Sequence, residues 1–81
     1  MSDTQEIPVI YSAVWCPYCV VLEKFLDSKG IDYEKRDVDE PGVREEMNKR
    51  TNGNQTIPTM FIGDEFWVNP SKQIIVEKLL A

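Results

Sequence analysis

Residues 16–19, Cys-Pro-Tyr-Cys, lie at the boundary between two different patterns in the chain. Residues 7–11 form a compact apolar run rich in β-forming side chains, which predicts a buried strand. Beyond the cysteines, Leu22 and Leu26 recur at a spacing of four and predict a helix with an apolar face. Pro17 suits the first helical position, because proline lacks the N–H group that would be unpaired there. The chain therefore passes from strand to helix at the cysteine pair.

Further elements follow from turn and cap residues. Lys29-Gly30, a basic last turn followed by glycine, predicts the end of the first helix. Residues 31–38 alternate in part and predict a second, more exposed strand. A second helix is predicted to open at Asp39-Glu40-Pro41 and to end at Asn52-Gly53. Its apolar stripe is narrow, so we expect it to lie on the surface with its charges solvated.

The C-terminal third predicts a hairpin and a last helix. Residues 59–62 and 65–68 are strand-like and flank a Gly-Asp turn, and Asn69-Pro70 suits the start of a helix. The order is β-α-β-α-β-β-α, with a parallel, right-handed first βαβ unit. We expect an α/β fold in which a four-stranded mixed sheet carries helices on both faces. Residues 1–81 are expected to form a single domain, with a short polar tail over residues 1–6.

Composition excludes several classes of function. The 81 residues carry 9 Lys+Arg against 14 Asp+Glu, and a net charge of −5 is a poor match for nucleic acid. There is no apolar run near the roughly 20 residues of a membrane span, and the first residues lack the pattern of a signal peptide. We therefore expect a cytoplasmic protein. The chain has no histidine, which removes the commonest general base and metal ligand, and we expect no bound cofactor.

The cysteine pair predicts redox chemistry. A C-x-x-C sequence beside a βαβ pattern is typical of a thioredoxin-like redox motif. Cys16 falls at the helix N-cap, where unpaired N–H groups and the helix dipole stabilise an anion on its sulfur. Cys19 lies three residues further on the same face, close enough to attack Cys16 once that sulfur is modified. We therefore assign Cys16 as the nucleophile and Cys19 as the more buried second thiol.

Three other interpretations of the pair have less support. A structural disulfide across so small a loop would remove little entropy from the unfolded chain. A zinc site needs four ligands, and two cysteines without histidine leave only carboxylates to complete it. Two unrelated buried thiols remain an alternative, although their place at a helix N-terminus argues against chance.

A second motif is Thr56-Ile57-Pro58-Thr59. A proline just before a strand commonly ends a loop and needs no further role. If the Ile57–Pro58 bond were cis, the backbone of Ile57 would face the Cys16 sulfur and could pair with a bound thiol substrate, as an added strand does. Only about 5–6% of X–Pro bonds are cis, so the sequence pattern alone leaves this open.

Strand–CPYC–helix, then TIP running into a strand, a glycine turn and a last helix, resembles the glutaredoxins. The resemblance extends from about Val9 to the end of the chain. It implies the thioredoxin fold, a cis Pro58, and a nucleophilic Cys16 that reduces mixed disulfides with a low-molecular-weight thiol. It also implies two kinds of partner, the small thiol and disulfide-containing client proteins, and we expect a monomer.

Two departures from the glutaredoxin pattern bear on the thiol. Most glutaredoxins carry a lysine shortly before the first cysteine, where this chain has Ser12-Ala13-Val14-Trp15. Most also follow the last strand with Gly-Gly and an acidic residue, where this chain has residues 69–73, Asn-Pro-Ser-Lys-Gln. Glutathione carries two carboxylates and one ammonium, so its site needs matching charges. Trp15 and Trp67 instead offer flat apolar faces suited to sugar rings, with packing as the alternative role for either tryptophan.

Residues 52–58, with the pattern NGN-x-T-x-P, and the Asn69-Pro70-Ser71 start of the last helix are similar to the mycoredoxins of actinobacteria. That resemblance implies mycothiol, an uncharged cysteinyl pseudo-disaccharide, as co-substrate, with glutathione the less favoured thiol. The residues assigned to substrate binding are Trp15, Tyr18, Ile57, Pro58, Trp67 and Asn69.

Two rival functions keep the motif and change the partner. NrdH-type redoxins, which receive electrons from thioredoxin reductase and pass them to ribonucleotide reductase, resemble W-S-G-F-R-P before the last helix, where this chain has Trp67-Val68-Asn69-Pro70-Ser71. Some glutaredoxins bridge a [2Fe–2S] cluster between two chains, because such clusters need four thiolates. Pro17 stiffens the motif loop, which we expect to disfavour that cluster.

Overall fold

The computed structural model describes residues 7–80, so the predicted tail over residues 1–6 lies outside the described part of the chain. The elements, in chain order, are β1 (Val9–Ser12), α1 (Pro17–Ser28), β2 (Glu34–Asp37), α2 (Val43–Arg50), β3 (Thr59–Ile62), β4 (Glu65–Val68) and α3 (Lys72–Ile75), with a π-helical continuation over Val76–Leu80. This is the predicted order β-α-β-α-β-β-α.

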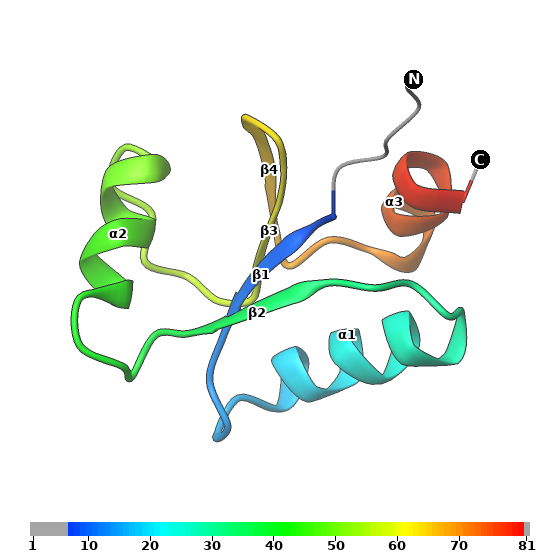
Figure 1. Cartoon of the computed structure of the whole chain (residues 1–81), viewed down its shortest axis with the longest axis horizontal. Coiled ribbons are helices and arrows are strands. Elements are labelled where there is room, and N and C mark those ends of the chain that lie inside the picture. Colours follow the sequence, from blue (N-terminus) through cyan, green and yellow to red (C-terminus); the bar gives the residue numbers. More distant parts are fainter. Residues whose placement is uncertain (1–6, 81) are drawn as a thin grey trace.

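The strands form one mixed sheet in the spatial order β2-β1-β3-β4 (Figure 1). β1 runs parallel to β2 and antiparallel to β3, and β3 and β4 form the predicted antiparallel hairpin. Ser12 pairs with Asp37 and Tyr11 with Thr59. The ends of β1 and β2 and the beginning of β3 therefore meet at one edge of the sheet.

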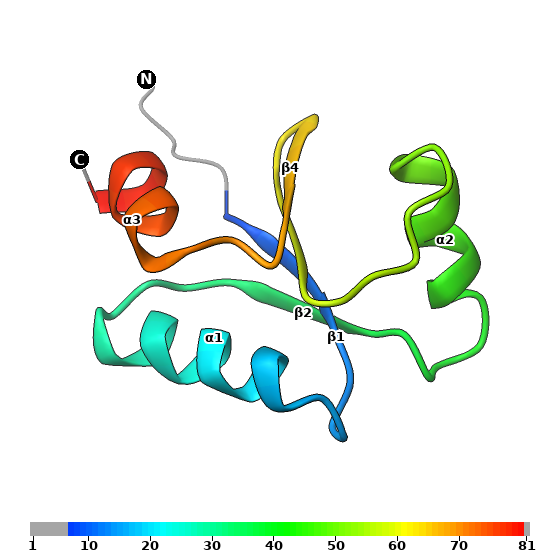
Figure 2. The same cartoon turned by 180° about the vertical axis from the view of Figure 1, so that it is seen from behind.

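Helices cover both faces of the sheet, as predicted. Successive side chains of a strand point to opposite faces, so Ile10 of β1 and Tyr11 of β1 belong to different packing layers. Ile10 packs with side chains of α1 and α3, whereas Tyr11 packs with Val43 and Met47 of α2. Figures 1 and 2 show the same arrangement from front and back, with α2 on one side of the strands and α3 on the other.

The predicted start of α2 is wrong. Asp39, Glu40 and Pro41 precede the helix, which begins at Val43 after Gly42 in a left-handed conformation with φ 82°. The reason lies in the turn after β2, where Asp39 N–H donates to Asp37 Oδ1 (2.9 Å) and Glu40 N–H donates to the Asp37 carbonyl (3.0 Å). The acidic residues therefore make a turn before the chain becomes helical.

The predicted start of α3 is also displaced. Ser71, not Asn69, is the N-cap, and its hydroxyl accepts the Ile74 N–H at 3.2 Å. Asn69 has φ 48° and its N–H donates to the Pro58 carbonyl at 2.7 Å. Asn69 is thus used to tie the end of β4 to the loop before β3.

The charges of α2 are not all solvated, contrary to expectation. Glu46 accepts hydrogen bonds from the Tyr11 hydroxyl and from Arg36 of β2. Arg50 donates to the Tyr11 hydroxyl at 2.9 Å and lies 3.9 Å from the centre of the Phe61 ring. The Tyr11 and Arg36 donors lower the pKa of Glu46, while burial and Glu46 raise the pKa of Tyr11. These contacts connect α2 to strands β1, β2 and β3.

Between residues 7 and 80, the longest apolar helical segment falls short of what a membrane crossing requires.

Candidate active site

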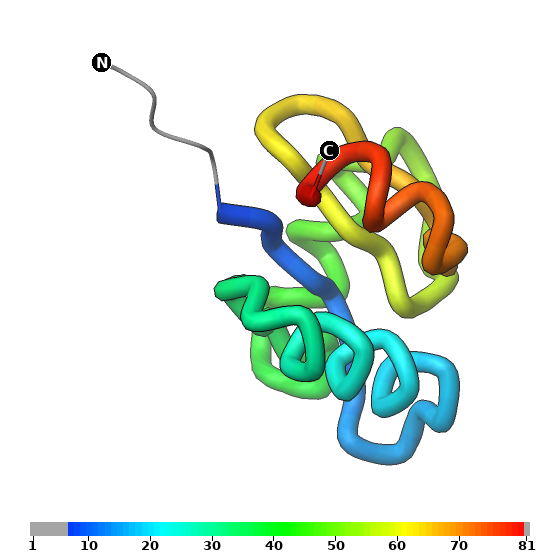
Figure 3. The backbone as a smooth tube through the Cα atoms, turned by 90° about the vertical axis from the view of Figure 1, so that its right-hand side faces the viewer, coloured from blue at the N-terminus to red at the C-terminus, as the bar shows by residue number. Residues whose placement is uncertain are grey.

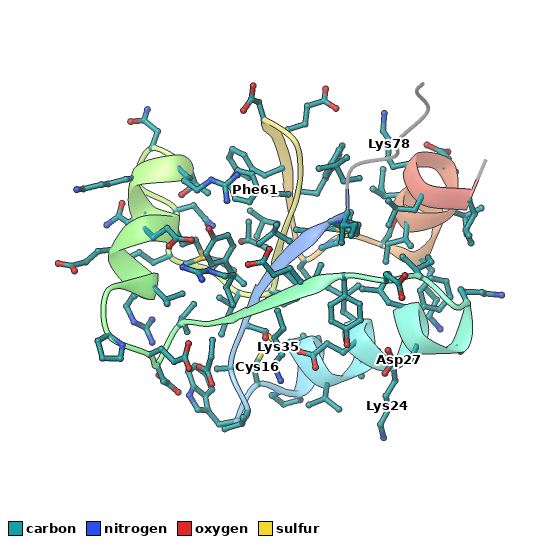
Figure 4. The ribbon with its side chains drawn as sticks, in the orientation of Figure 1. Cys16, Lys24, Asp27, Lys35, Phe61 and Lys78 are labelled. Atoms are coloured by element: carbon teal, nitrogen blue, oxygen red, sulfur yellow. The ribbon has the colours of Figure 1, made fainter. Side chains whose placement is uncertain are left out.

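Three loops meet at the edge of the sheet where β1 and β2 end and β3 begins. Figure 3 shows β1, in blue, running into the turn that starts α1, and Cys16 stands at that start in Figure 4. Since Thr59 pairs with Tyr11, Pro58 lies at the same edge. The turn after Asp37 reaches this edge as well, because β2 is parallel to β1. The fold alone brings these segments, distant in sequence, to the cysteine pair.

Cys16 occupies the N-cap of α1 with an extended backbone, φ −96° and ψ 110°. Its sulfur accepts the Cys19 N–H at 3.2 Å, which is one of the unpaired donors of a helix N-terminus. The Cys16 carbonyl accepts the Val20 N–H at 3.1 Å and so begins the helical hydrogen bonding. Both cysteines are free thiols. A backbone donor therefore points at the sulfur of Cys16, the residue that the sequence predicts to be the nucleophile.

Cys19 has a different environment. Its side chain is completely buried, whereas Cys16 keeps 4% of its surface exposed. Burial, together with the neighbouring Cys16 sulfur, raises the pKa of the Cys19 thiol to about 12. At neutral pH, Cys19 therefore holds its proton and lies one turn behind Cys16. The two thiols therefore differ in burial, and Cys19 is the more buried one, as predicted.

The loop before β3 faces the same cluster of side chains. The Ile57–Pro58 bond is cis, as the glutaredoxin resemblance implied. Pro58 is buried, and Ile57 packs against the hydrophobic cluster that contains both cysteines. The N–H of Asn69 on the Pro58 carbonyl places Asn69 beside this loop. Ile57, Pro58 and Asn69, all assigned to substrate binding from the sequence, are thus brought together.

A glutaredoxin family model matches residues 9–67. The chain belongs to the glutaredoxin family. Members are thiol–disulfide oxidoreductases, and the cysteine pair at the N-terminus of α1 supplies that chemistry. A glutaredoxin from Pseudomonas aeruginosa is 37% identical over 57 residues, which is 69% of this chain and 67% of that protein.

Alignments with two further proteins extend over most of this glutaredoxin. Mycoredoxin 1 of Corynebacterium glutamicum is 38% identical over 74 residues, 89% of this chain and 91% of that protein. The crystal structure of a glutaredoxin from Archaeoglobus fulgidus has a TM-score of 0.78 at 20% identity, and the alignment covers 98% of this chain and 90% of the other. The latter likeness is one of fold, and it confirms the predicted α/β architecture.

Exposed aromatic side chains lie on either side of Cys16 in the sequence of this glutaredoxin. Trp15 is 60% exposed and Tyr18 is 67% exposed. The Trp15 indole Nε1 donates to Asp39 Oδ2 at 2.6 Å, and Arg44 donates to Asp39 Oδ1 at 3.3 Å. Asp39 could not be assigned to the site from the sequence, because 24 residues separate it from Trp15.

Trp67 lies elsewhere in the glutaredoxin fold. Its side chain packs against the cluster on the α1 and α3 face of the sheet, which includes Met60 and Ile75. The Lys78 ammonium is 5.7 Å from the centre of its ring. Trp67 therefore packs against one core cluster, whereas Cys16 and Cys19 belong to the other.

Asn54, which is not among the residues assigned from the sequence, supports the loop that leads to Ile57 and Pro58. Its side-chain amide donates to the Thr56 carbonyl (3.2 Å) and to Thr59 Oγ1 (3.0 Å), while its Oδ1 accepts the Thr56 N–H (3.2 Å). Thr59 Oγ1 in turn donates to the Thr56 carbonyl at 2.6 Å. These bonds hold the backbone that leads into Ile57. The preference of asparagine for bonding to a backbone two residues ahead is the signal that could have identified it.

Proposed function

We propose that this glutaredoxin reduces mixed disulfides between proteins and mycothiol. The observation that carries the proposal is the chemistry of the surface around Cys16. Of the four residues before Cys16, Ser12 and Ala13 are buried and Val14 and Trp15 are exposed, so an aromatic and an apolar side chain lie where glutathione would need a cation. The similarity to Mycoredoxin 1 over nearly the whole chain supports the same thiol.

Charge and shape both favour an uncharged co-substrate. A sugar ring packs well on a flat indole face, whose only polar group here already has a partner in Asp39. The carboxylates of glutathione would meet a chain of net charge −5. The last strand is followed by Asn69, Pro70 and Ser71, and the Ser71 hydroxyl is used as the helix cap.

The reaction follows from the two cysteine environments. The Cys16 thiolate attacks the mycothiol-side sulfur of the mixed disulfide, a Cys16–mycothiol disulfide forms, and the client sulfur leaves as a thiolate that takes up a proton. A second mycothiol thiolate attacks the bound mycothiol sulfur and releases Cys16, forming mycothiol disulfide. Because a second mycothiol releases Cys16, this route does not require Cys19, whose pKa is raised to about 12.

We also propose the class of client protein, the compartment and the oligomeric state. Client proteins would be those that acquire mixed disulfides with the small thiol, and the cytoplasm is the compartment that keeps such thiols reduced. Cys16 and Cys19 are buried within one chain, so a monomer is sufficient for the reaction.

The test compares the two thiols on one client. A model peptide is prepared as its mycothiol and its glutathione mixed disulfide, and release of the free peptide is followed with the matching thiol as reductant. We expect about tenfold faster release in the mycothiol pair, from roughly 1.4 kcal/mol of charge mismatch with glutathione. Equal rates would refute the choice of thiol. Rapid turnover with thioredoxin reductase and NADPH alone would instead favour an NrdH-type role, and Cys16→Ser supplies the inactive control.

A further inference from the structure

Trp15, the residue before Cys16, is fixed by a hydrogen bond rather than by burial. Its side chain is 60% exposed, so packing holds it only in part. Its single donor, Nε1–H, is bonded to Asp39 Oδ2 at 2.6 Å. An exposed indole without such a bond would be free to change rotamer. The orientation of the ring beside the nucleophile therefore depends on Asp39.

Asp39 is itself held from two directions. Its N–H donates to Asp37 Oδ1 at 2.9 Å in the turn that ends β2, and its Oδ1 accepts Arg44 Nη2 at 3.3 Å from the first turn of α2. Since β2 runs parallel to β1, this turn reaches the edge of the sheet where Cys16 lies. The hydrogen bonds from Trp15 and Arg44 to Asp39 thus join the active-site turn to α2.

The Asp39–Arg44 ion pair also determines the charge beside the Trp15 ring. The Asp39 and Arg44 side chains are each 46% exposed and paired with one another, so the surface next to Trp15 presents a carboxylate and a guanidinium that balance. A carboxylate has about four acceptor positions, of which Trp15 and Arg44 use two here. The remaining positions suit hydroxyl donors, whereas a substrate carboxylate would find Arg44 already engaged.

We propose that Asp39 is a positioning and specificity-determining residue of this glutaredoxin: it holds the Trp15 ring in one orientation beside Cys16, so that an uncharged, polyhydroxylated ring of the small thiol packs on it. The proposal rests on the proposed function, in which such a thiol is bound at Cys16. It assigns a role in substrate recognition to the turn between β2 and α2.

The variants separate the hydrogen bond from the charge. Asp39→Ala removes the acceptor, and Asp39→Asn keeps an acceptor oxygen while removing the charge. Glu40→Ala removes a charge from the same exposed turn and is the matched control. Trp15→Phe keeps an aromatic ring without the N–H donor.

Kinetics on the mycothiol mixed disulfide provide the first measurement. We expect Asp39→Ala to raise KM about fivefold, the value of one hydrogen bond, with kcat changed less than about twofold. Asp39→Asn should restore most of the wild-type KM, and Glu40→Ala should match wild type. With a small disulfide that lacks sugar rings, Asp39→Ala should equal wild type. In the Trp15→Phe background, Asp39→Ala should add little, because the two residues act through one bond.

A second measurement needs no substrate. In the ¹H–¹⁵N spectrum, Asp39→Ala should shift the Trp15 indole signal and speed its exchange with solvent, while the Trp67 indole signal stays in place as an internal reference. If wild type reduces no small-thiol mixed disulfide, the proposed function fails, and the indole signal still reports on the bond. If wild type is active and the indole signal moves but KM does not, the role of Asp39 in substrate recognition is overturned, and an unmoved indole signal would overturn its positioning role. Equal KM increases for the mycothiol and glutathione substrates would overturn its role in specificity.

Discussion

The two cysteines lie only three residues apart, yet their thiols differ in hydrogen bonding and burial. Cys16 is the N-cap, just before the first helical turn, and its sulfur accepts the Cys19 N–H. Cys19 belongs to that first turn, and its side chain is completely buried. The raised pKa of Cys19 follows first from that burial and next from the neighbouring sulfur. The helix start therefore gives the Cys16 sulfur a backbone donor and keeps Cys19 protonated near neutral pH, which agrees with the proposed attacking role of Cys16.

Replacing Cys19 should test this assignment. We expect Cys19→Ser to retain most of the turnover with the small thiol, because release of Cys16 by a second thiol does not use Cys19, and Cys16→Ser to lose all of it. Mass spectrometry after brief iodoacetamide treatment at pH 7 should show one adduct in wild type and in Cys19→Ser, and none in Cys16→Ser. Loss of turnover in Cys19→Ser would mean that the internal disulfide is obligatory.

At the scale of the element, α1 is defined at both ends by its caps. Pro17 and the Cys16 N-cap begin it, and Gly30 ends it with φ 68°. The Gly30 N–H donates to the Asp27 carbonyl (3.1 Å), and the Ile31 N–H donates to the Leu26 carbonyl (3.0 Å). These bonds satisfy carbonyls of the last turn, so the helix that carries Cys16 is terminated by backbone geometry.

Gly30→Ala should cost about 1 kcal/mol of the free energy of unfolding, the penalty of a left-handed conformation for a residue with a Cβ atom. An added Cβ would have open space around it, so the backbone conformation is the only source of the cost. Denaturant unfolding measures the difference. Gly30→Asn should lose less, since asparagine tolerates this conformation, and exposed Asp32→Ala is the control. A Gly30→Ala protein as stable as wild type would contradict the capping role.

Elements with local signals were predictable, and those decided by distant partners were not. The bounds of β3 and β4 were predicted, because their strand pattern is confined between a proline and turn residues. The starts of α2 and α3 were misplaced, because Asp39 and Asn69, both good cap residues, bond to other parts of the fold. In the site, a compact motif identified Cys16 and Cys19, whereas the partnership of Trp15 with Asp39 has no fixed spacing that a sequence could reveal.

At the scale of the whole molecule, the titrating groups determine how stability depends on pH. The pKa of Glu46 is lowered, so its stabilising contribution is present above its ordinary value and is lost as pH falls. The pKa values of Cys19, Tyr11 and Tyr33 are raised, so the folded state keeps protons that the unfolded chain releases, and stability falls as pH rises above their ordinary values. The chain has no histidine to titrate between these limits.

Thermal unfolding should therefore give a plateau from about pH 5.5 to 8, with a decline on either side. On the acid side, Glu46→Gln should lower stability at pH 7 and make the decline below about pH 4 shallower. On the alkaline side, Cys19→Ser should make the decline above roughly pH 8.5 shallower. Glu45→Gln, which changes the exposed neighbour of Glu46 on α2, is the control for Glu46→Gln. A transition centred near pH 6.5 would show that another group governs stability.

Strand β2, one of the two edge strands of the sheet, reads Glu-Lys-Arg-Asp and supplies no apolar side chain to either layer of the core. Its Lys35 forms a salt bridge with Glu23 of α1, and its Arg36 forms one with Glu46 of α2. A foreign strand approaching this border would have to line up against alternating charges, which discourages the edge-to-edge stacking that leads to aggregates. The charged side chains of β2 therefore disfavour the pairing of this edge with a strand of another copy.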